Sequence, residues 1–231
     1  MQIRGFLKTT LLDYPGHVAS TLFAGGCNFR CPFCHNGDLV LNPGETSLIS
    51  EEEIFSHLRR RQGILDGVCI SGGEPTLAPD LENFIRKIRS LGLAVKLDTN
   101  GYQTKTLIRL CEQGLLDYVA MDIKHTPEKY NSICQMSHFD ISRINTSVHF
   151  LMQGSIPYEF RTTLVQELHN TEDILRMGKW LKGAKAYYLQ AYRDADTVIS
   201  PGFHAHNRET LLSYVEQLKH FIPNTVLRGV D

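Results

Sequence analysis

The sequence predicts an α/β fold built around a parallel sheet, and two observations support this prediction. Strand-like and helix-like segments alternate along all 231 residues, as in a chain of βα units. The polar motifs directly follow predicted strands, at the sheet edge where such folds bind ligands. Six βα units of this kind form either an open doubly wound sheet or a partial barrel.

Short apolar runs rich in β-branched and aromatic residues indicate six core strands. These strands are expected at residues 18–23, 67–70, 94–98, 118–123, 158–165 and 186–190. Helices are expected at residues 51–61, 80–90, 105–113, 140–152, 171–181 and 208–221. Ser50 precedes three glutamates and is a good N-cap for the first helix, while Gly92 ends the second. Residues 126–153 are the least regular part, although Pro127 suggests a helix start.

The length fits one large domain or two small ones, and the hydrophobic content of 42% is ordinary for a globular protein. Because no low-complexity linker divides the sequence, we expect one domain over residues 1–231. The formal net charge of −1 gives no strong attraction to nucleic acid or to an anionic membrane. No apolar run approaches the length of a membrane span, and the N-terminus lacks a secretory apolar region. Six cysteines without a secretion signal predict a reducing, cytoplasmic location rather than a disulfide framework.

Three of the cysteines form a closely spaced group after the first predicted strand. Cys27, Cys31 and Cys34 stand at offsets of four and three, so one loop could hold all three sulfurs around a small cluster. Thiolates select iron–sulfur clusters or zinc, and three thiolates on a four-iron cluster would keep one iron open. Two alternatives remain: a Cys₃His zinc site completed by His35, and inert buried thiols. The other cysteines are scattered: Cys69, Cys111 and Cys134.

The segment around this group resembles the signature of the radical S-adenosylmethionine (radical SAM) enzymes. Residues 26–36 read Gly-Cys-Asn-Phe-Arg-Cys-Pro-Phe-Cys-His-Asn and are similar to the activases of glycyl radical enzymes. Residues 10–16, Thr-Leu-Leu-Asp-Tyr-Pro-Gly, resemble the activators of anaerobic ribonucleotide reductase in particular. The resemblance implies a partial (β/α)₆ barrel, a 4Fe–4S cluster on the three cysteines, and S-adenosyl-L-methionine (SAM) as cofactor.

The resemblance also assigns two motifs to SAM binding. Gly72, Gly73 and Glu74 look like the motif whose backbone and acid hold the amino group of the SAM methionine. Asn36 would lie near the SAM methyl end, and Phe33 would pack on the adenine side. Without the resemblance, the glycine pair is equally well explained as a tight βα turn.

Two further motifs bring carboxylates to the predicted site. Asp98, Thr99 and Asn100 follow the third strand, where the resemblance implies contact with the SAM methionine or ribose. Asp122 and Lys124 follow the fourth strand on one face, and in the activases this acid helps to bind SAM or a monovalent cation. A simple turn and a solvated salt bridge are the respective alternatives. Two acids beside a ligand carboxylate require a cation or a lysine.

Four residues later in the chain are harder to assign. Arg161 lies among apolar neighbours in a strand, so it forms either a structural ion pair or, by resemblance, a contact near the SAM carboxylate. Gln190 stands where some activases have a histidine near the adenosine. His204 and His206 form a His-x-His pair that could bind a metal or simply be exposed.

The resemblance implies a reaction. An electron from the reduced cluster, delivered by flavodoxin or ferredoxin, cleaves SAM to methionine and a 5′-deoxyadenosyl radical. The radical then abstracts a glycine α-hydrogen from a partner, first of all an anaerobic ribonucleoside-triphosphate reductase. A barrel open on one side suits such a peptide loop. The alternatives are an activase of the pyruvate formate-lyase type, a radical SAM enzyme with a small-molecule substrate, and a non-catalytic iron–sulfur electron carrier or zinc-stabilised module.

Overall fold

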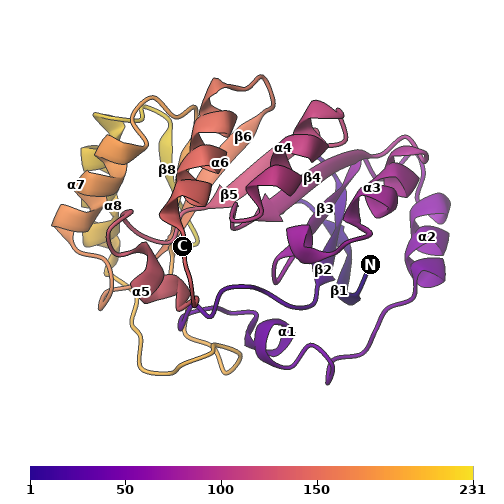
Figure 1. Ribbon diagram of the computed structural model, residues 1–231, viewed down its shortest axis with the longest axis horizontal. Coiled ribbons are helices and arrows are strands. Elements are labelled where there is room, and N and C mark those ends of the chain that lie inside the picture. The colour runs from indigo at the N-terminus through magenta and orange to yellow at the C-terminus, as the bar shows by residue number, and fades with distance from the viewer. Residues whose placement is uncertain (231) are drawn as a thin grey trace.

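The computed structural model describes residues 1–230 and arranges its eight strands in one curved sheet (Figure 1). The strand order follows the chain order; β1 runs antiparallel to β2, and all later neighbours are parallel. A doubly wound sheet would reverse its order at a switch point, so this order identifies a barrel. The strands are β1 (Ile3–Thr10), β2 (Ala19–Ala24), β3 (Gly67–Gly72), β4 (Ala94–Thr99), β5 (Tyr118–Asp122), β6 (Tyr158–Leu164), β7 (Tyr187–Ala191) and β8 (Thr225–Arg228).

The helices are arranged around the outside of this sheet (Figure 1). Polar side chains define several of their starts: Ser50 accepts a hydrogen bond from the Glu53 backbone, and Asn170 forms a capping box with Asp173. No helix within residues 1–230 is long and apolar enough to cross a membrane. The helices are α1 (Gly37–Leu41), α2 (Glu51–Arg60), the 3₁₀ turn η1 (Pro75–Leu77), α3 (Leu81–Arg89), α4 (Thr104–Glu112), α5 (Tyr130–Cys134), α6 (Ile141–Gln153), α7 (Thr171–Trp180) and α8 (Arg208–Lys219).

The predicted parallel barrel is confirmed, and each of the six predicted strands and six predicted helices is present with small shifts at its ends. The sequence missed β1, β8, the short helix α1 and η1, while α5 begins at Tyr130, three residues after the helix start that Pro127 suggested. β8 is only four residues long and leaves Val226 exposed, so it lacks the apolar run that marks a core strand. β8 adds a seventh parallel strand after the six βα units, and β1 and β8 are not paired with each other in the described chain. The barrel is therefore partial.

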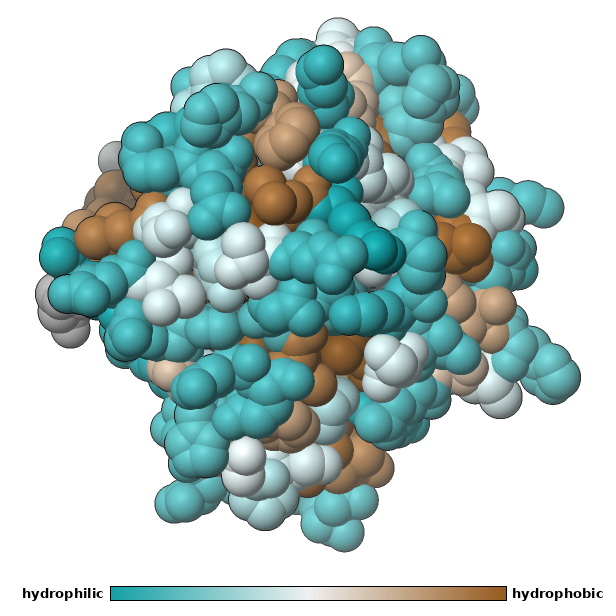
Figure 2. All heavy atoms as spheres, turned by 90° about the vertical axis from the view of Figure 1, so that its left-hand side faces the viewer, coloured by the Kyte–Doolittle hydropathy of each residue, from teal (hydrophilic) through white to brown (hydrophobic). Residues whose placement is uncertain are grey.

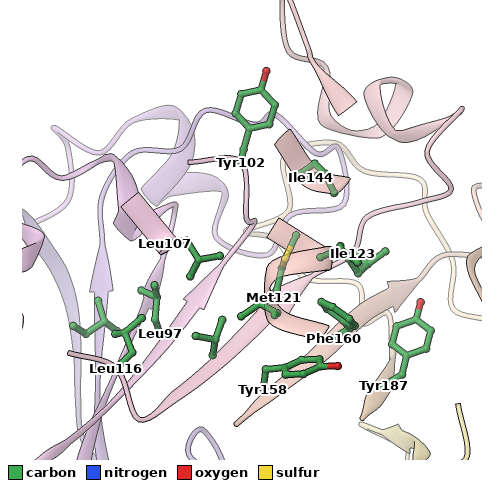
Figure 3. Packing of buried hydrophobic residues seen from close by; sticks show 14 of the residues in the cluster. Leu97, Tyr102, Leu107, Leu116, Met121, Ile123, Ile144, Tyr158, Phe160 and Tyr187 are labelled. Carbon is green, nitrogen blue, oxygen red and sulfur yellow. The ribbon is translucent and has the colours of Figure 1, made fainter. Parts of the chain in front are cut away.

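The two faces of the central strands carry different side chains. Leu97, Met121 and Phe160 point from neighbouring strands toward the helices, where they pack with Leu107 and Ile144 (Figure 3). Residues one position away along the same strands face the barrel interior, because side chains alternate across a strand. The outer surface seen in Figure 2 is mostly hydrophilic, with small separate hydrophobic patches. The hydrophobic core thus lies between sheet and helices, and the barrel interior is left to polar residues.

Residues 10–16 close the barrel at the end opposite the polar motifs. Thr10 pairs with Ala19 at the beginning of β2, and the Asp13 carboxylate accepts a hydrogen bond of 2.5 Å from the Thr21 hydroxyl. Tyr14 is buried against Gly67, where an added Cβ would lie 2.9 Å from the tyrosine ring. This segment therefore shapes the floor of the barrel and does not line the ligand cavity at the carboxyl ends of the strands.

Candidate functional site

A cavity of about 270 Å³ lies at the carboxyl ends of the parallel strands. Strands β2 to β6 and the loops after them supply the side chains that the sequence assigned to the cluster and to SAM. Parallel strands end at one edge, so residues up to 163 positions apart in the chain, Cys27 and Gln190, meet there. All of the predicted site residues line the cavity except Glu74. The lining also includes Gln190, at the position of the activase histidine, and His35, the alternative zinc ligand. Four further lining residues had not been placed there from the sequence: Phe29, Val40, Ser71 and Thr163.

The three predicted ligand cysteines lie in the loop between β2 and α1. The Cys34 backbone N–H donates to the Cys31 carbonyl at 3.0 Å, and the Phe29 N–H donates to the Cys27 sulfur at 3.4 Å. Burial, followed by the nearby Glu74 charge, raises the pKa of Cys27 to about 12. A thiolate at this depth therefore needs a bound cation such as iron, which removes the proton when the metal binds.

The arrangement fits a cluster better than a single zinc ion. Within residues 1–230 no three His, Cys, Asp or Glu side chains lie close enough together to hold one metal ion. Zinc ligands must converge on one ion, whereas each thiolate of a four-iron cluster binds its own iron, which allows wider spacing. His35 Nε2 lies 2.5 Å from the Arg193 carbonyl oxygen, so this nitrogen is already engaged and does not act as a fourth zinc ligand.

A fourth cysteine lies beside this loop. Cys134, at the end of α5, lies beside the Cys31 sulfur, and this neighbouring thiol lowers the pKa of Cys31. Burial raises the pKa of Cys134 itself. The Cys134 carbonyl also accepts a hydrogen bond of 2.8 Å from the Arg30 backbone. The sequence treated Cys134 as incidental because it lies 100 positions from the cysteine loop.

A strap formed by residues 193–200, in the loop between β7 and α8, holds the cysteine loop from outside (Figure 1). The Gly37 N–H donates to the Thr197 carbonyl at 3.1 Å, and the Ser200 N–H donates to the Pro32 carbonyl at 2.8 Å. The Ile199 N–H donates to the Cys34 carbonyl at 3.3 Å. Nothing in the local sequence indicated this contact, because the donors and acceptors of these three hydrogen bonds are backbone groups.

Replacing Gly37 with Ala should loosen the cluster site. An added Cβ at Gly37 would lie 2.3 Å from the Thr197 carbonyl oxygen, so the strap must move away. Overpacking of this kind costs about 1–3 kcal/mol, or roughly tenfold in the rate at which a chelator removes iron under anaerobic conditions. Gly44→Ala is the matched control, since nothing lies within 4 Å of its added Cβ. Equal iron release from the two variants would contradict a role for the strap.

The glycine motif after β3 packs directly on the cysteine loop. Gly72 has φ +114°, which disfavours any side chain, and its carbonyl accepts a hydrogen bond of 3.0 Å from Asn36. An added Cβ at Gly73 would lie 2.0 Å from the Gly26 carbonyl. The Glu74 N–H donates to the same Gly26 carbonyl at 2.8 Å. The two glycines are therefore required by the close approach of two loops, whatever else their backbone binds.

Glu74 occupies a different position from the one expected for a SAM contact. Its carboxylate is fully buried outside the cavity lining and accepts hydrogen bonds from Thr76, from Thr99 Oγ1 at 2.8 Å and from the Asn100 N–H at 2.7 Å. Burial raises the pKa of Glu74, although these hydrogen bonds favour the charged form. Both carboxylate oxygens are satisfied within the protein. In the structure Glu74 fixes the turn after β4 rather than facing the cavity.

A chain of ion pairs crosses the floor of the cavity. Arg161 Nη1 lies 3.1 Å from Asp98 Oδ2, and Arg161 Nε lies 2.9 Å from Asp122 Oδ1. Lys124 Nζ lies 3.1 Å from Asp122 Oδ2, and Lys96 Nζ pairs with Asp98 Oδ1. Burial alone would raise the carboxyl pKa values, but the positive charges lower the pKa of Asp98 and hold that of Asp122 at about 2. Both acids are therefore ionised, and Lys96 is a member that the sequence had not suggested.

The chain's His-x-His pair does not form a metal site. His204 Nδ1 lies 2.6 Å from the Glu167 carboxylate at the surface. His206 Nε2 faces the His169 carbonyl at 3.0 Å. The two side chains have different partners and do not converge on a common metal ion.

Comparisons with known proteins agree with this geometry. Residues 21–184 match the family model of the Radical SAM superfamily. A Methanocaldococcus jannaschii protein whose name describes it as a glycyl-radical enzyme activating enzyme is 31% identical over 198 residues, which cover 84% of this chain and 81% of that protein. A pyruvate formate-lyase-activating enzyme of Clostridium pasteurianum is 32% identical over 123 residues, covering 51% of this chain and 50% of that enzyme.

Solved structures show the same fold. SuiB of Streptococcus suis bound to S-adenosylmethionine superposes with a TM-score of 0.70 at 14% identity, over 89% of this chain and 49% of SuiB. A domain of a pyruvate-formate lyase-activating enzyme from Bacteroides vulgatus gives a TM-score of 0.56 at 16% identity, over 71% of this chain and 99% of that domain. The family match, the fold and the cavity with its three cysteines agree. This chain therefore belongs to the radical SAM superfamily, whose enzymes use a 4Fe–4S cluster and SAM.

Proposed function

We propose that this radical SAM enzyme activates a glycyl radical enzyme by removing an α-hydrogen atom from a glycine of that partner. The observation that carries the proposal is the similarity to a named activating enzyme along 81% of that enzyme's length. The open barrel supports it, since β1 and β8 leave a side through which a peptide could approach. We further propose that residues 1–231 act as one radical SAM domain in the cytoplasm, where the six free thiols stay reduced.

In this proposal the residues of the cavity bind and position two cofactors. Cys27, Cys31 and Cys34 hold the cluster, while the cations at the cavity floor orient the SAM carboxylate. When bound, the reduced cluster and SAM together supply homolysis of a sulfur–carbon bond. Phe33 and Val40 line the cavity with apolar surface, which excludes water from a radical reaction. The protein therefore positions the two cofactors, supplies the charges around SAM and excludes water from the cavity.

Anaerobic ribonucleoside-triphosphate reductase is the partner that we propose first. Residues 10–16 carry the resemblance to its activators, but they form the barrel floor, so their support for this partner is indirect. A partner of the pyruvate formate-lyase type is the second candidate, favoured by the Clostridium pasteurianum relative. Flavodoxin or ferredoxin would supply the electron, because the cluster potential must lie toward the low end of the range of roughly −700 to +450 mV.

The test follows a deuterium atom from partner to product. The reconstituted protein, SAM and a reductant are mixed anaerobically with one candidate enzyme whose glycine α-carbons carry deuterium. We expect deuterium in 5′-deoxyadenosine and a glycyl doublet in the EPR spectrum of the true partner, because hydrogen transfer needs close contact. Parallel reactions with the reductase and the lyase distinguish the two candidates. SAM cleavage without either signal in both reactions would rule out the activase proposal for these partners.

A further inference from the structure

The resemblance to the activases allowed a monovalent cation beside Asp98 and Asp122, and the structure shows that such an ion does not fit. Asp98 has Lys96 at Oδ1 and Arg161 at Oδ2, the latter at 3.1 Å. Asp122 has Arg161 at Oδ1, 2.9 Å away, and Lys124 at Oδ2, 3.1 Å away. Each of the four carboxylate oxygens already has a cationic partner. An added ion would have to displace one of these side chains.

Lys96 is the least expected member of this group. Its side chain is 2% exposed, and it points into the barrel from β4, two residues before Asp98 and on the same face. Its Nζ contacts the Asp98 carboxylate and lies 3.7 Å from the Cys69 sulfur on β3. Burying an ammonium group is expensive unless it is paired, so its position is explained by the charge that it supplies to Asp98.

The net charge of the side chains at the cavity floor also argues against a bound monovalent cation. Lys96, Lys124 and Arg161 face two carboxylates, which leaves one positive charge in excess. The carboxylate of the SAM methionine would neutralise that excess. A bound alkali ion would instead leave a net positive charge in a partly buried site, where uncompensated charge is unfavourable.

We propose that Lys96 is the built-in cation of the SAM site, and that SAM therefore binds to this protein without a monovalent metal ion. The ammonium group of Lys96 provides the positive charge at Asp98 that a sodium or potassium ion would otherwise provide. A covalently attached cation needs no ion from solution, so SAM affinity becomes independent of the salt cation. The inference needs only SAM binding and does not depend on which protein is the substrate.

The first experiment measures SAM affinity in salts of different cations. The anaerobically reconstituted protein is titrated with SAM by calorimetry in potassium chloride, in sodium chloride and in tetramethylammonium chloride at equal ionic strength. Tetramethylammonium is too large to replace a small ion between two carboxylates. We expect the same dissociation constant in all three salts. A dissociation constant at least tenfold lower in potassium or sodium than in tetramethylammonium chloride would overturn the proposal.

The second experiment asks whether an ion can replace Lys96. Lys96→Ala removes the ammonium and leaves space, so SAM should bind about tenfold more weakly in tetramethylammonium chloride. Potassium or ammonium ions should restore part of that affinity. Lys96→Met fills the space without charge, and its weakened binding should not be restored. A purely structural role for Lys96 would give no such difference between the two variants.

Exposed Lys87, which pairs with Glu51 at the surface, provides the control, since Lys87→Ala should bind SAM like the unchanged protein in every salt. Unchanged affinity of Lys96→Ala in tetramethylammonium chloride would refute the proposal. If Lys96→Ala fails to hold its cluster, Lys96→Met and the salt series on the unchanged protein still decide the question. The readout is binding alone, so a missing partner enzyme cannot be mistaken for a failure of this inference.

Discussion

Replacing Cys27, Cys31 or Cys34 with Ala, one at a time, should abolish retention of the iron–sulfur cluster. The three sulfurs come from one loop and face one cavity, and within the described chain no other set of side chains offers three thiolates. Two remaining thiolates leave a second iron without a protein ligand, so the cluster should be lost to chelators and oxygen. Iron and acid-labile sulfide per chain, measured after anaerobic reconstitution, are the readouts.

Cys134→Ala is the sharpest control for this assignment, because the Cys134 thiol contacts the Cys31 sulfur and is fully buried. We expect this variant to keep its iron and sulfide, since Cys134 lies on α5, outside the loop that carries the three predicted ligands. Cys69→Ala and Cys111→Ala, farther along the fold, should do the same. Loss of the cluster in Cys134→Ala to the same extent as in Cys31→Ala would mean that the ligand set is wrong.

Replacing Arg161 with Gln should strongly destabilise the protein and its SAM site. Arg161 bridges Asp98 and Asp122, and both acids stay ionised in the cavity floor. Asp98 keeps Lys96 and Asp122 keeps Lys124, but each carboxylate loses one buried charge-assisted hydrogen bond, which costs about 1.5–3 kcal/mol apiece. Urea unfolding of the apoprotein should show this decrease in the free energy of unfolding, and SAM affinity of the reconstituted variant should fall about tenfold or more.

Two further variants separate charge from shape at this position. Arg161→Lys keeps the charge but cannot bridge two carboxylates with one planar group, so its stability should fall between those of the unchanged protein and Arg161→Gln. Adding Asp98→Asn to Arg161→Gln leaves the buried Lys96 without its carboxylate partner and should lower the stability further. An Arg161→Gln variant as stable as the unchanged protein would show that the ion-pair chain contributes nothing to the fold.

Local sequence patterns were sufficient for a parallel α/β sheet, whereas the choice of a barrel over a doubly wound sheet came from the resemblance to the radical SAM enzymes. The strands around Ile70 and Val119 are short apolar runs, the strand around Leu97 alternates with the polar Lys96 and Asp98, and the helices α2 and α7 begin at clear caps. β1 and β8 escaped detection because each lies at an edge of the sheet, where burial and therefore apolar patterning are weaker. Their assignment depends on pairing with β2 and β7, which the local sequence does not reveal.

Like the fold, the candidate site has residues that the sequence predicts and residues that only the structure reveals. The ligand cysteines, the glycine pair and the acids after β4 and β5 were recognisable because each motif is contiguous and follows a strand. Lys96 was not recognisable from the sequence, because the residues around a lysine in a strand do not indicate that it is buried against Asp98. Glu74 was assigned by its motif to the ligand, whereas its contacts with Thr99 and Asn100 come from a loop about 25 residues away.

The sequence by itself therefore determined the fold class, the three cysteines and the strand ends at which polar groups collect, because these depend on spacing and periodicity along the chain. Only the tertiary structure decided how those groups are paired: Arg161 between two acids, Cys134 against Cys31, and the strap of residues 193–200 across the cysteine loop. These contacts join backbone and side-chain atoms from distant segments. Their geometry is fixed by strand register and loop packing, which no local pattern encodes.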